Sequence, residues 1–160
     1  MTRETYIAVV GPSAGTPAEL AIGEAVGRGI AEAGGVLVCG GMGGVMEAAA
    51  GGCADARGRS VGILPSDSRL DANPYVTIAV ATGMGEARNA IVVRTADAVI
   101  AVHGEFDTLS EIALALKMGK PVVGLGTWEL GKDGEPVDAI VPAIDAREAV
   151  DKALRLARAG

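Results

Sequence analysis

The stretch Val36-Leu-Val-Cys-Gly-Gly-Met-Gly-Gly-Val-Met46 decides how the rest of the chain is interpreted. It begins as an apolar run, becomes a glycine cluster at positions 40, 41, 43 and 44, and leads into the alanine-rich segment 46–56. That order predicts a strand, a tight turn and a helix N-terminus. Because glycine has no Cβ, its backbone N–H groups can approach a ligand, and the helix dipole favours an anion there. A turn that binds nothing is the alternative, but this density of glycine favours a phosphate-bearing small molecule.

Apolar runs and helical patterns alternate along the whole chain. Strands are expected at 6–10, 36–39, 60–64, 75–81, 98–102, 122–125 and 139–142, with helices at about 17–33, 46–56, 86–95, 108–118 and from 146 onward. Thr16 and Glu19 have the spacing of a capping box, and the segment 128–136 is expected to be a loop. This alternation predicts a single α/β domain over residues 1–160, a doubly wound, Rossmann-like parallel sheet of about six or seven strands with helices on both faces.

Composition and charge narrow the function classes. The 160 residues carry 14 basic and 20 acidic side chains, a formal charge of −6, without a basic run, so nucleic acid is not an expected partner. The chain contains no apolar run of the ~20 residues that span a bilayer, and its start does not resemble a signal peptide. Cys39 and Cys53 lack disulfide or metal-ligand spacing and are expected to be buried thiols of a cytoplasmic protein. No metal site or obligatory cofactor is predicted.

Ligands of doubly wound sheets bind at the carboxyl ends of the strands. Four loops are expected there, at 11–16, 40–44, 82–85 and 103–107. The candidate ligand-binding residues of these loops and of the segments that follow them are Gly11, Ser13, Gly40, Gly41, Gly43, Gly44, Met46, Gly83, Gly104, Glu105, Asp107 and Thr108.

Common nucleotide and hydrolase signatures fit this chain poorly. It has no GxxxxGK[ST] motif, and therefore no P-loop lysine. Gly41-x-Gly43, with Asp67 farther on, is similar to a dinucleotide fingerprint, but it follows the second strand and Met46 replaces the third glycine. His103 is the only histidine and no GxSxG occurs, which disfavours a Ser/His/Asp hydrolase.

Two segments resemble the SLOG superfamily. Gly40-Gly41-x-x-Gly44-Val45-Met46 is similar to its GGGxxGLMG stretch, and 108–123, TLSEIALALKMGKPVV, is similar to GTLSEIALALKxGKPV of the molybdenum cofactor carrier branch. The superfamily also contains LONELY GUY-type nucleoside 5′-monophosphate phosphoribohydrolases, which were once misannotated as lysine decarboxylases. The resemblance extends from about residue 6 to 126 and implies a site for a nucleotide-like or pterin-phosphate ligand.

The resemblance to the phosphoribohydrolases implies roles for two further residues. Arg88 and Glu111 match the arginine and glutamate that flank the ribose and support N-glycosidic cleavage in those enzymes. Such cleavage passes through an oxocarbenium-like state that a nearby carboxylate stabilises. Arg88 could also clamp a phosphate bidentately. Without a ligand, Arg88 would form a surface or intersubunit salt bridge, and Glu111 would be a first-turn carboxylate.

The chain departs from the hydrolase pattern where a phosphate should bind. The hydrolases read Pro-Gly-Gly-x-Gly-Thr, whereas the stretch 103–108 reads His-Gly-Glu-Phe-Asp-Thr, and Ser110 replaces a second glutamate. Glu105 and Asp107 would repel a phosphate, so they either point away or bind a hydroxyl, a pterin-like N–H group or a divalent cation. Alternatively, Asp107 caps a helix that begins at Thr108.

Two function classes follow, with one assembly expectation. The first is a non-catalytic binding protein similar to the molybdenum cofactor carriers, with that cofactor or a nucleotide as its ligand. The alternative is a phosphoribohydrolase of the cytokinin-riboside-monophosphate or AMP type, which releases the base and ribose 5-phosphate; lysine decarboxylation is not expected.

The apolar residues 91–93, 109 and 112–116 point in successive directions around their helices, which predicts at least a homodimer. The relatives' dimer, formed through these helices, agrees with that expectation, and coverage by the terminal helix is the alternative.

Overall fold

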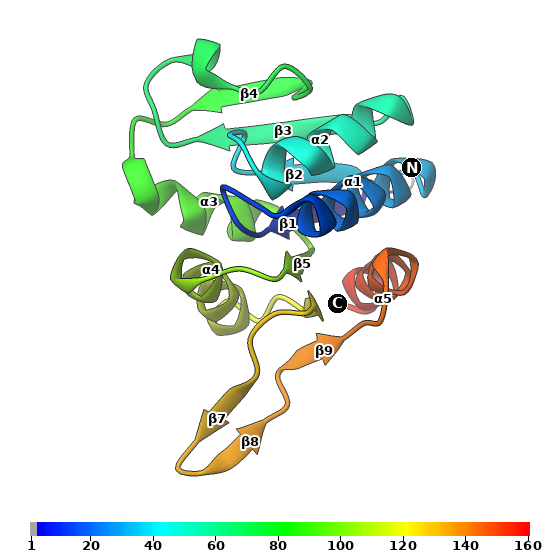
Figure 1. Cartoon of the computed structure of the whole chain (residues 1–160), viewed down its shortest axis with the longest axis vertical. Helices are drawn as coiled ribbons and strands as arrows, with labels where there is room; N and C mark the ends of the chain where they lie inside the picture. Colours follow the sequence, from blue (N-terminus) through cyan, green and yellow to red (C-terminus); the bar gives the residue numbers. More distant parts are fainter. Residues whose placement is uncertain (1–2) are drawn as a thin grey trace.

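Seven parallel strands form the central sheet in the computed structural model of the protein, which describes residues 3–160 (Figure 1). The spatial order is β4-β3-β2-β1-β5-β6-β9, and every neighbouring pair is parallel. The bounds are β1 Tyr6–Val10, β2 Val36–Cys39, β3 Arg59–Leu64, β4 Ile78–Ala81, β5 Ala98–Val102, β6 Val122–Leu125 and β9 Ile140–Pro142. The predicted α/β class, sheet type and strand number are confirmed.

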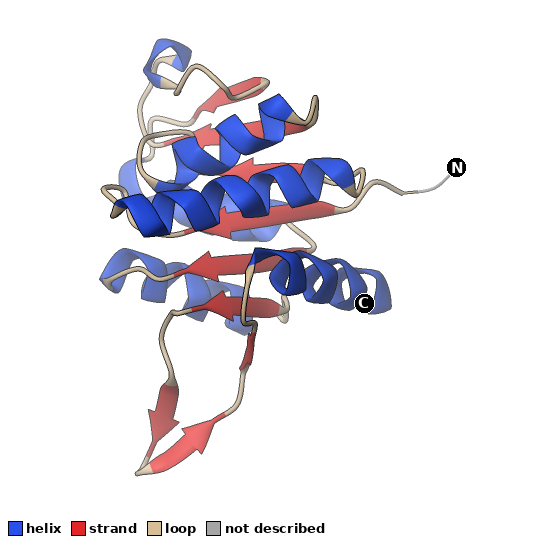
Figure 2. Cartoon of the chain, turned by 45° about the vertical axis from the view of Figure 1, so that its right-hand side comes forward, coloured by secondary structure: helices blue, strands red, loops and turns tan. Residues whose placement is uncertain are grey.

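Helices cover both faces of this sheet. Figure 2 shows α1 (Pro17–Glu32), α2 (Val45–Asp55) and α5 (Ala146–Ala159) on the near face. The opposite face carries α3 (Arg88–Thr95) and α4 (Phe106–Lys117), and two short 3-10 turns, η1 (Arg69–Asp71) and η2 (Gly85–Ala87), lie in the connections. The chain builds β1 to β4 outward in one direction and then crosses to β5 on the other side of β1. The topological switch point therefore lies between β1 and β5.

The strands are apolar throughout because both of their faces are buried. Ile7 and Val9 of β1 join the core beneath α1, α2 and α5, whereas Ala8 and Val10 join the core beneath α3 and α4. All four side chains are at most 2% exposed. Successive side chains of β1 thus point to opposite faces of the sheet and pack in two separate hydrophobic cores.

The start of α1 follows its sequence signature. The Thr16 hydroxyl accepts a hydrogen bond from Glu19 N at 3.2 Å, and the Glu19 carboxylate accepts one from Thr16 N at the same distance. The capping box is confirmed, and it fixes the end of the β1–α1 loop, residues 11–16, which forms one wall of the site.

Several boundaries differ from the sequence-based expectation, most of them by one or two residues. The segment 128–136 is not wholly a loop, because β7 (Leu130–Lys132) and β8 (Glu135–Val137) pair as an antiparallel hairpin that projects from the body in Figure 1. Strand β4 begins at Ile78 instead of at position 75. Helix α2 begins one residue earlier than expected, and α4 begins at Phe106 instead of Thr108.

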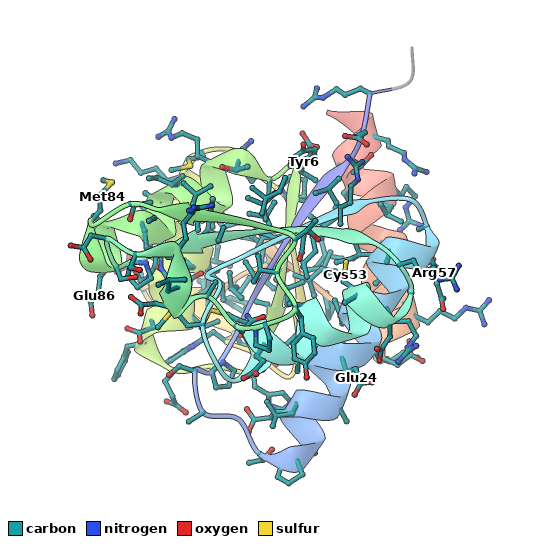
Figure 3. All side chains as sticks on the ribbon, turned by 90° about the horizontal axis from the view of Figure 1, so that it is seen from above. Tyr6, Glu24, Cys53, Arg57, Met84 and Glu86 are labelled. Carbon is teal, nitrogen blue, oxygen red and sulfur yellow. The ribbon has the colours of Figure 1, made fainter. Side chains whose placement is uncertain are left out.

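Both cysteines are free and buried, as predicted. Burial raises the pKa of each thiol to about 11. In the view from above (Figure 3), Cys53 lies within the molecule, whereas Met84 and Glu86 lie at its rim, next to and within η2. Across residues 3–160, every helix is too short or too polar to span a bilayer.

Candidate functional site

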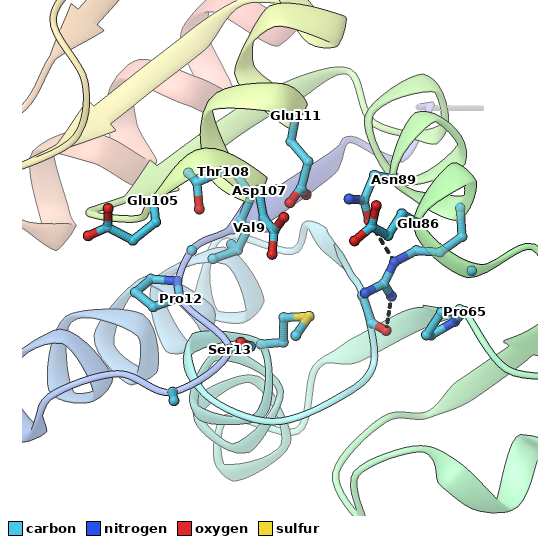
Figure 4. A pocket seen from close by; sticks show the side chains of 17 residues that line it. Val9, Pro12, Ser13, Pro65, Glu86, Asn89, Glu105, Asp107, Thr108 and Glu111 are labelled. Atoms are coloured by element: carbon cyan, nitrogen blue, oxygen red, sulfur yellow. Dashed lines mark hydrogen bonds between the residues drawn. The ribbon is translucent and has the colours of Figure 1, made fainter.

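A cavity of about 410 Å³ opens at the carboxyl ends of the central strands, beside the switch point between β1 and β5 (Figure 4). Its walls come from the β1–α1 loop, from the segments that follow β2 and β3, from η2 and α3, and from the start of α4. The lining residues are Val9, Val10, Gly11, Pro12, Ser13, Ala14, Gly40, Met46, Pro65, Gly85, Glu86, Arg88, Asn89, Glu105, Asp107, Thr108 and Glu111. Its volume falls within the range of ligand pockets in proteins.

Most of the sequence-predicted site residues meet in this cavity. Those in its wall are Gly11, Ser13, Gly40, Met46, Arg88, Glu105, Asp107, Thr108 and Glu111. Those outside it are Gly41, Gly43, Gly44, Gly83 and Gly104. The position of the first set is thereby established, and contact with a ligand stays a prediction.

The glycine cluster of residues 40–44 serves chain packing more than ligand approach. Gly41 has φ +76°, and a Cβ there would lie 2.7 Å from Cδ2 of Leu64 in β3. Gly44 has φ +68°, and its Cβ would collide with the backbone of Pro12 and Ser13. Both positions require glycine for the turn itself. Gly43 lies beside the same loop, with the site of its missing Cβ 3.6 Å from the carbonyl of Ser13.

Arg88 is anchored to the ends of two strands. Its Nη1 donates to the carbonyl of Ile63 at 2.7 Å and to the carbonyl of Gly40, and its Nε donates to Oδ1 of Asn89 at 2.7 Å. Gly40 makes room for this arrangement, since a Cβ there would lie 2.6 Å from Nη1. Burial lowers the pKa of Arg88, and the neighbouring carboxyl group of Glu111 opposes that shift. Arg88 forms no salt bridge within residues 3–160, so the expectation of a surface salt bridge is wrong. Its Nη2 has no acceptor in that range, and binding of a phosphate there stays a prediction.

The start of α4 presents unpaired donors. The Glu105 side chain makes no cap hydrogen bond, and the N–H groups of Phe106, Asp107 and Thr108 have no acceptor within the described chain. Asp107 lies in the first helical turn and does not cap the helix, so that alternative is wrong. Thr108 is 1% exposed, yet no protein partner for its hydroxyl is found in residues 3–160, and Figure 4 shows that hydroxyl directed toward the cavity. These groups form an uncompensated helix N-terminus, which favours an anion.

The β1–α1 loop presents a second row of donors on the facing wall. The N–H groups of Ser13, Ala14 and Gly15 donate to no acceptor in the part of the chain that the structure describes. Ser13 and Ala14 line the same cavity as Thr108. Two sets of backbone donors therefore approach one space from different elements, and we call this part of the cavity the amide end.

The opposite part of the cavity, which we call the carboxyl end, holds Asp107, Glu111 and Arg88. Figure 4 shows the carboxyl groups of Asp107 and Glu111 turned toward the same space, whereas that of Glu105 lies on the far side of Thr108. Burial raises the pKa of Glu111 to about 8; the Arg88 guanidinium opposes that shift and Asp107 adds to it. Glu111 is therefore largely protonated at neutral pH and can donate as well as accept a hydrogen bond.

Sequence reasoning missed several residues of the wall. Asn89 orients Arg88, Pro12 and Pro65 shape the walls, and Glu86 adds a carboxylate on η2. Trp128 lies outside the cavity, but its Nε1 donates to the carbonyl of Glu105 at 3.1 Å and braces the start of α4. The position of Asn89 directly after Arg88 was the only local signal among these.

The chain has clear relatives among known proteins. The SLOG cluster4 family matches residues 4–152. The chain is 52% identical over 100 residues to an uncharacterized protein of Archaeoglobus fulgidus, a match that spans 62% of this chain and only 66% of that protein.

Two solved structures are similar over nearly their whole length. The molybdenum cofactor binding protein of the phototrophic bacterium Rippkaea orientalis superposes with a TM-score of 0.87 at 34% identity, covering 98% of this chain and 99% of that one. The molybdenum cofactor carrier protein of Chlamydomonas reinhardtii gives a TM-score of 0.85 at 32% identity, covering 96% and 98% of the two chains. The resemblance to the SLOG superfamily and to its carrier branch is confirmed.

Proposed function

The chain belongs to the SLOG cluster4 family, and on that premise we propose that it binds a phosphate-bearing small molecule, nucleotide-like or pterin-phosphate, as a protein similar to the molybdenum cofactor carriers. The phosphate occupies the amide end of the cavity, and the rest of the ligand extends toward the carboxyl end. The molybdenum cofactor itself is one candidate ligand, supported by the two similar structures.

One observation carries this proposal: the Thr108 hydroxyl is directed toward a cavity that is also lined by Ser13 and Ala14, whose N–H groups have no acceptor within residues 3–160. A bound anion would accept hydrogen bonds from several of these donors together, and the helix dipole of α4 would favour its charge. Fixed backbone dipoles can hold an anion in a protein of net negative charge, because the charge they present is local.

Native mass spectrometry of protein purified under mild conditions tests the proposal. We expect a bound phosphate-containing small molecule in the wild type and its loss in Thr108→Val, which removes the hydroxyl and keeps the side-chain shape. Recovery of ligand-free wild-type protein that also fails to bind AMP and GMP would contradict the proposal.

A hydrolytic activity is the second candidate. Arg88 and Glu111 line the same cavity, which is the arrangement that cleavage of a nucleoside 5′-monophosphate requires. Water would add to C1′ of the ribose as the glycosidic bond breaks; a protonated Glu111 would give its proton to the departing base, and its carboxylate would then take up the proton that the water releases. Incubation with AMP and chromatographic measurement of free adenine tests this; release that disappears in Glu111→Gln supports the enzyme, and no release contradicts it.

We also propose that the protein is at least a homodimer through the face of α3 and α4. Val92, Val93 and Ile112 are buried in the monomer, whereas Ile91 and Leu116 remain half-buried on the same two helices. Such residual apolar surface is typical of an interface. Light scattering at micromolar concentration should give at least twice the monomer mass, and a monomeric mass would contradict the proposal.

A further inference from the structure

Helix α4 presents two carboxyl groups to the carboxyl end of the cavity. Asp107 and Glu111 are one turn apart, so they lie on the same face of the helix, and both line the cavity. Within residues 3–160, neither has a basic nitrogen within salt-bridge distance. Two carboxyl groups at this spacing repel one another when both are ionised. Their acceptor oxygens are therefore directed toward the cavity and not toward a protein partner.

Arg88 is the basic residue in the cavity wall, but it does not neutralise this pair by direct contact. Its Nη1 and Nε are engaged by the carbonyls of Gly40 and Ile63 and by Asn89. Within residues 3–160, the guanidinium forms no salt bridge with either carboxyl group, although the charges of both act on it. Its positive charge also disfavours a free cation beside them.

A neutral group that donates hydrogen bonds matches this end of the cavity. A carboxylate accepts two parallel N–H bonds from a planar partner with adjacent donors, and such paired bonds add geometric specificity. The 2-amino-4-oxopyrimidine ring has that edge, with a ring N–H next to an exocyclic amino group. Guanine and pterins share this ring, whereas adenine has a ring acceptor at the corresponding place.

We propose that Asp107, together with Glu111, selects ligands whose ring has two adjacent N–H donors, so that the site prefers guanine- or pterin-type phosphates to adenine-type phosphates. This inference rests on the proposed function, because the phosphate at the amide end anchors the ligand, and the carboxyl end then recognises its ring. Asp107 contributes the accepting oxygens, and Glu111 extends the same polar surface one helical turn farther.

Isothermal titration calorimetry with four probes tests the selection: GMP, IMP, AMP and pterin-6-ylmethyl phosphate. GMP and IMP differ only in the exocyclic amino group. For the wild type, we expect GMP or the pterin phosphate to bind at least tenfold more tightly than IMP and AMP. The tighter of the two 2-amino probes then identifies the source of the ring.

Asp107→Asn and its matched control localise the effect. In Asp107→Asn, the preference for GMP over IMP should fall below about threefold, since the amide replaces one of the two acceptor oxygens with an NH2 donor. Asp151→Asn makes the same chemical change at an exposed position of α5 and should keep the wild-type preference. If Asp107→Asn does not fold, Glu111→Gln should reduce the same ratio.

Three results would overturn the inference. Equal wild-type affinity for GMP, IMP and AMP would contradict the ring selection and leave the proposed phosphate site standing. Loss of the GMP preference in Asp151→Asn would show that the effect is not local. Failure of all four probes to bind would overturn the proposed function as well. Thr108→Val separates the two claims, because it should weaken every phosphate by a similar factor without changing the ratio of GMP to IMP.

Discussion

The two ends of the cavity present different chemical groups. The amide end presents the N–H groups of Ser13 and Ala14 and the start of α4 with the Thr108 hydroxyl, none of which ionises near neutral pH. The carboxyl end holds Asp107, Glu111 and Arg88, where burial raises the pKa of Glu111 and lowers that of Arg88. If the proposed phosphate binds, this difference accounts for an anion in a chain of net charge −6, because fixed dipoles attract it locally while the carboxyl groups of Asp107 and Glu111 lie on the other side of Thr108.

The largest expected effect is a loss of stability when the Arg88 side chain at the carboxyl end is removed. Arg88→Ala leaves the carbonyls of Gly40 and Ile63 without their charged donor, and we expect a loss of about 3 kcal/mol in the free energy of unfolding. Urea denaturation measures it. Arg94→Ala, an exposed arginine on the same helix, is the matched control and should cost less than about 0.5 kcal/mol. Equal losses in the two variants would show that Arg88 does not tie the strand ends together.

The next effect is a dependence of the free energy of unfolding on pH, which arises from Glu111 at the carboxyl end. The folded-state pKa of Glu111 is about 8, above its ordinary value of 4.5, so the folded protein holds a proton that the unfolded chain releases. Stability should therefore fall as the pH rises from about 4.5 to 8, by on the order of 2 kcal/mol. Urea denaturation of the wild type and of Glu111→Gln at pH 5.5 and 8.5 measures it. The variant should lose much of that slope, and identical slopes would contradict the assignment.

A smaller effect concerns the amide end. Thr108→Val should weaken binding of a nucleoside monophosphate about tenfold, which corresponds to ~1.4 kcal/mol, through loss of one donor to the phosphate. Its affinity change should be nearly independent of pH between 6 and 8.5, in contrast to that of Glu111→Gln. The control is Thr95→Val, which makes the same change at the end of α3, outside the cavity wall. It should bind the nucleoside monophosphate as the wild type does. If Thr108→Val binds the nucleoside monophosphate as tightly as the wild type, the Thr108 hydroxyl does not contact the phosphate.

The sheet could be predicted from the sequence because a doubly covered parallel strand must be apolar on both faces. The runs 36–39 and 98–102 are entirely buried, and short apolar runs of this kind between turn residues are typical of such strands. The β7–β8 hairpin was missed because its strands contain Gly, Lys, Glu and Pro. Its turn, Asp133-Gly134, has both residues at positive φ, and this Asp-Gly pair was the available signal.

The site could be predicted only in outline. A sequence shows that glycine occurs at 41 and 44, but it does not show what occupies the place of the missing side chain. The neighbours are Leu64 and the backbone of Pro12, both distant in the chain, and they assign these glycines to packing. The anchoring of Arg88 is hidden for the same reason, because its acceptors lie at the ends of two other strands. The position of Thr108 near the start of α4 was predictable, and the direction of its hydroxyl toward the cavity was not.

One titration tests most directly whether the amide end anchors a phosphate. The affinities of the wild type for GMP and for guanosine differ only through that group, and calorimetry at low ionic strength measures both. We predict that GMP binds at least a hundredfold more tightly than guanosine, and that Thr108→Val reduces this ratio about tenfold. Equal affinity of the wild type for GMP and guanosine would contradict the account.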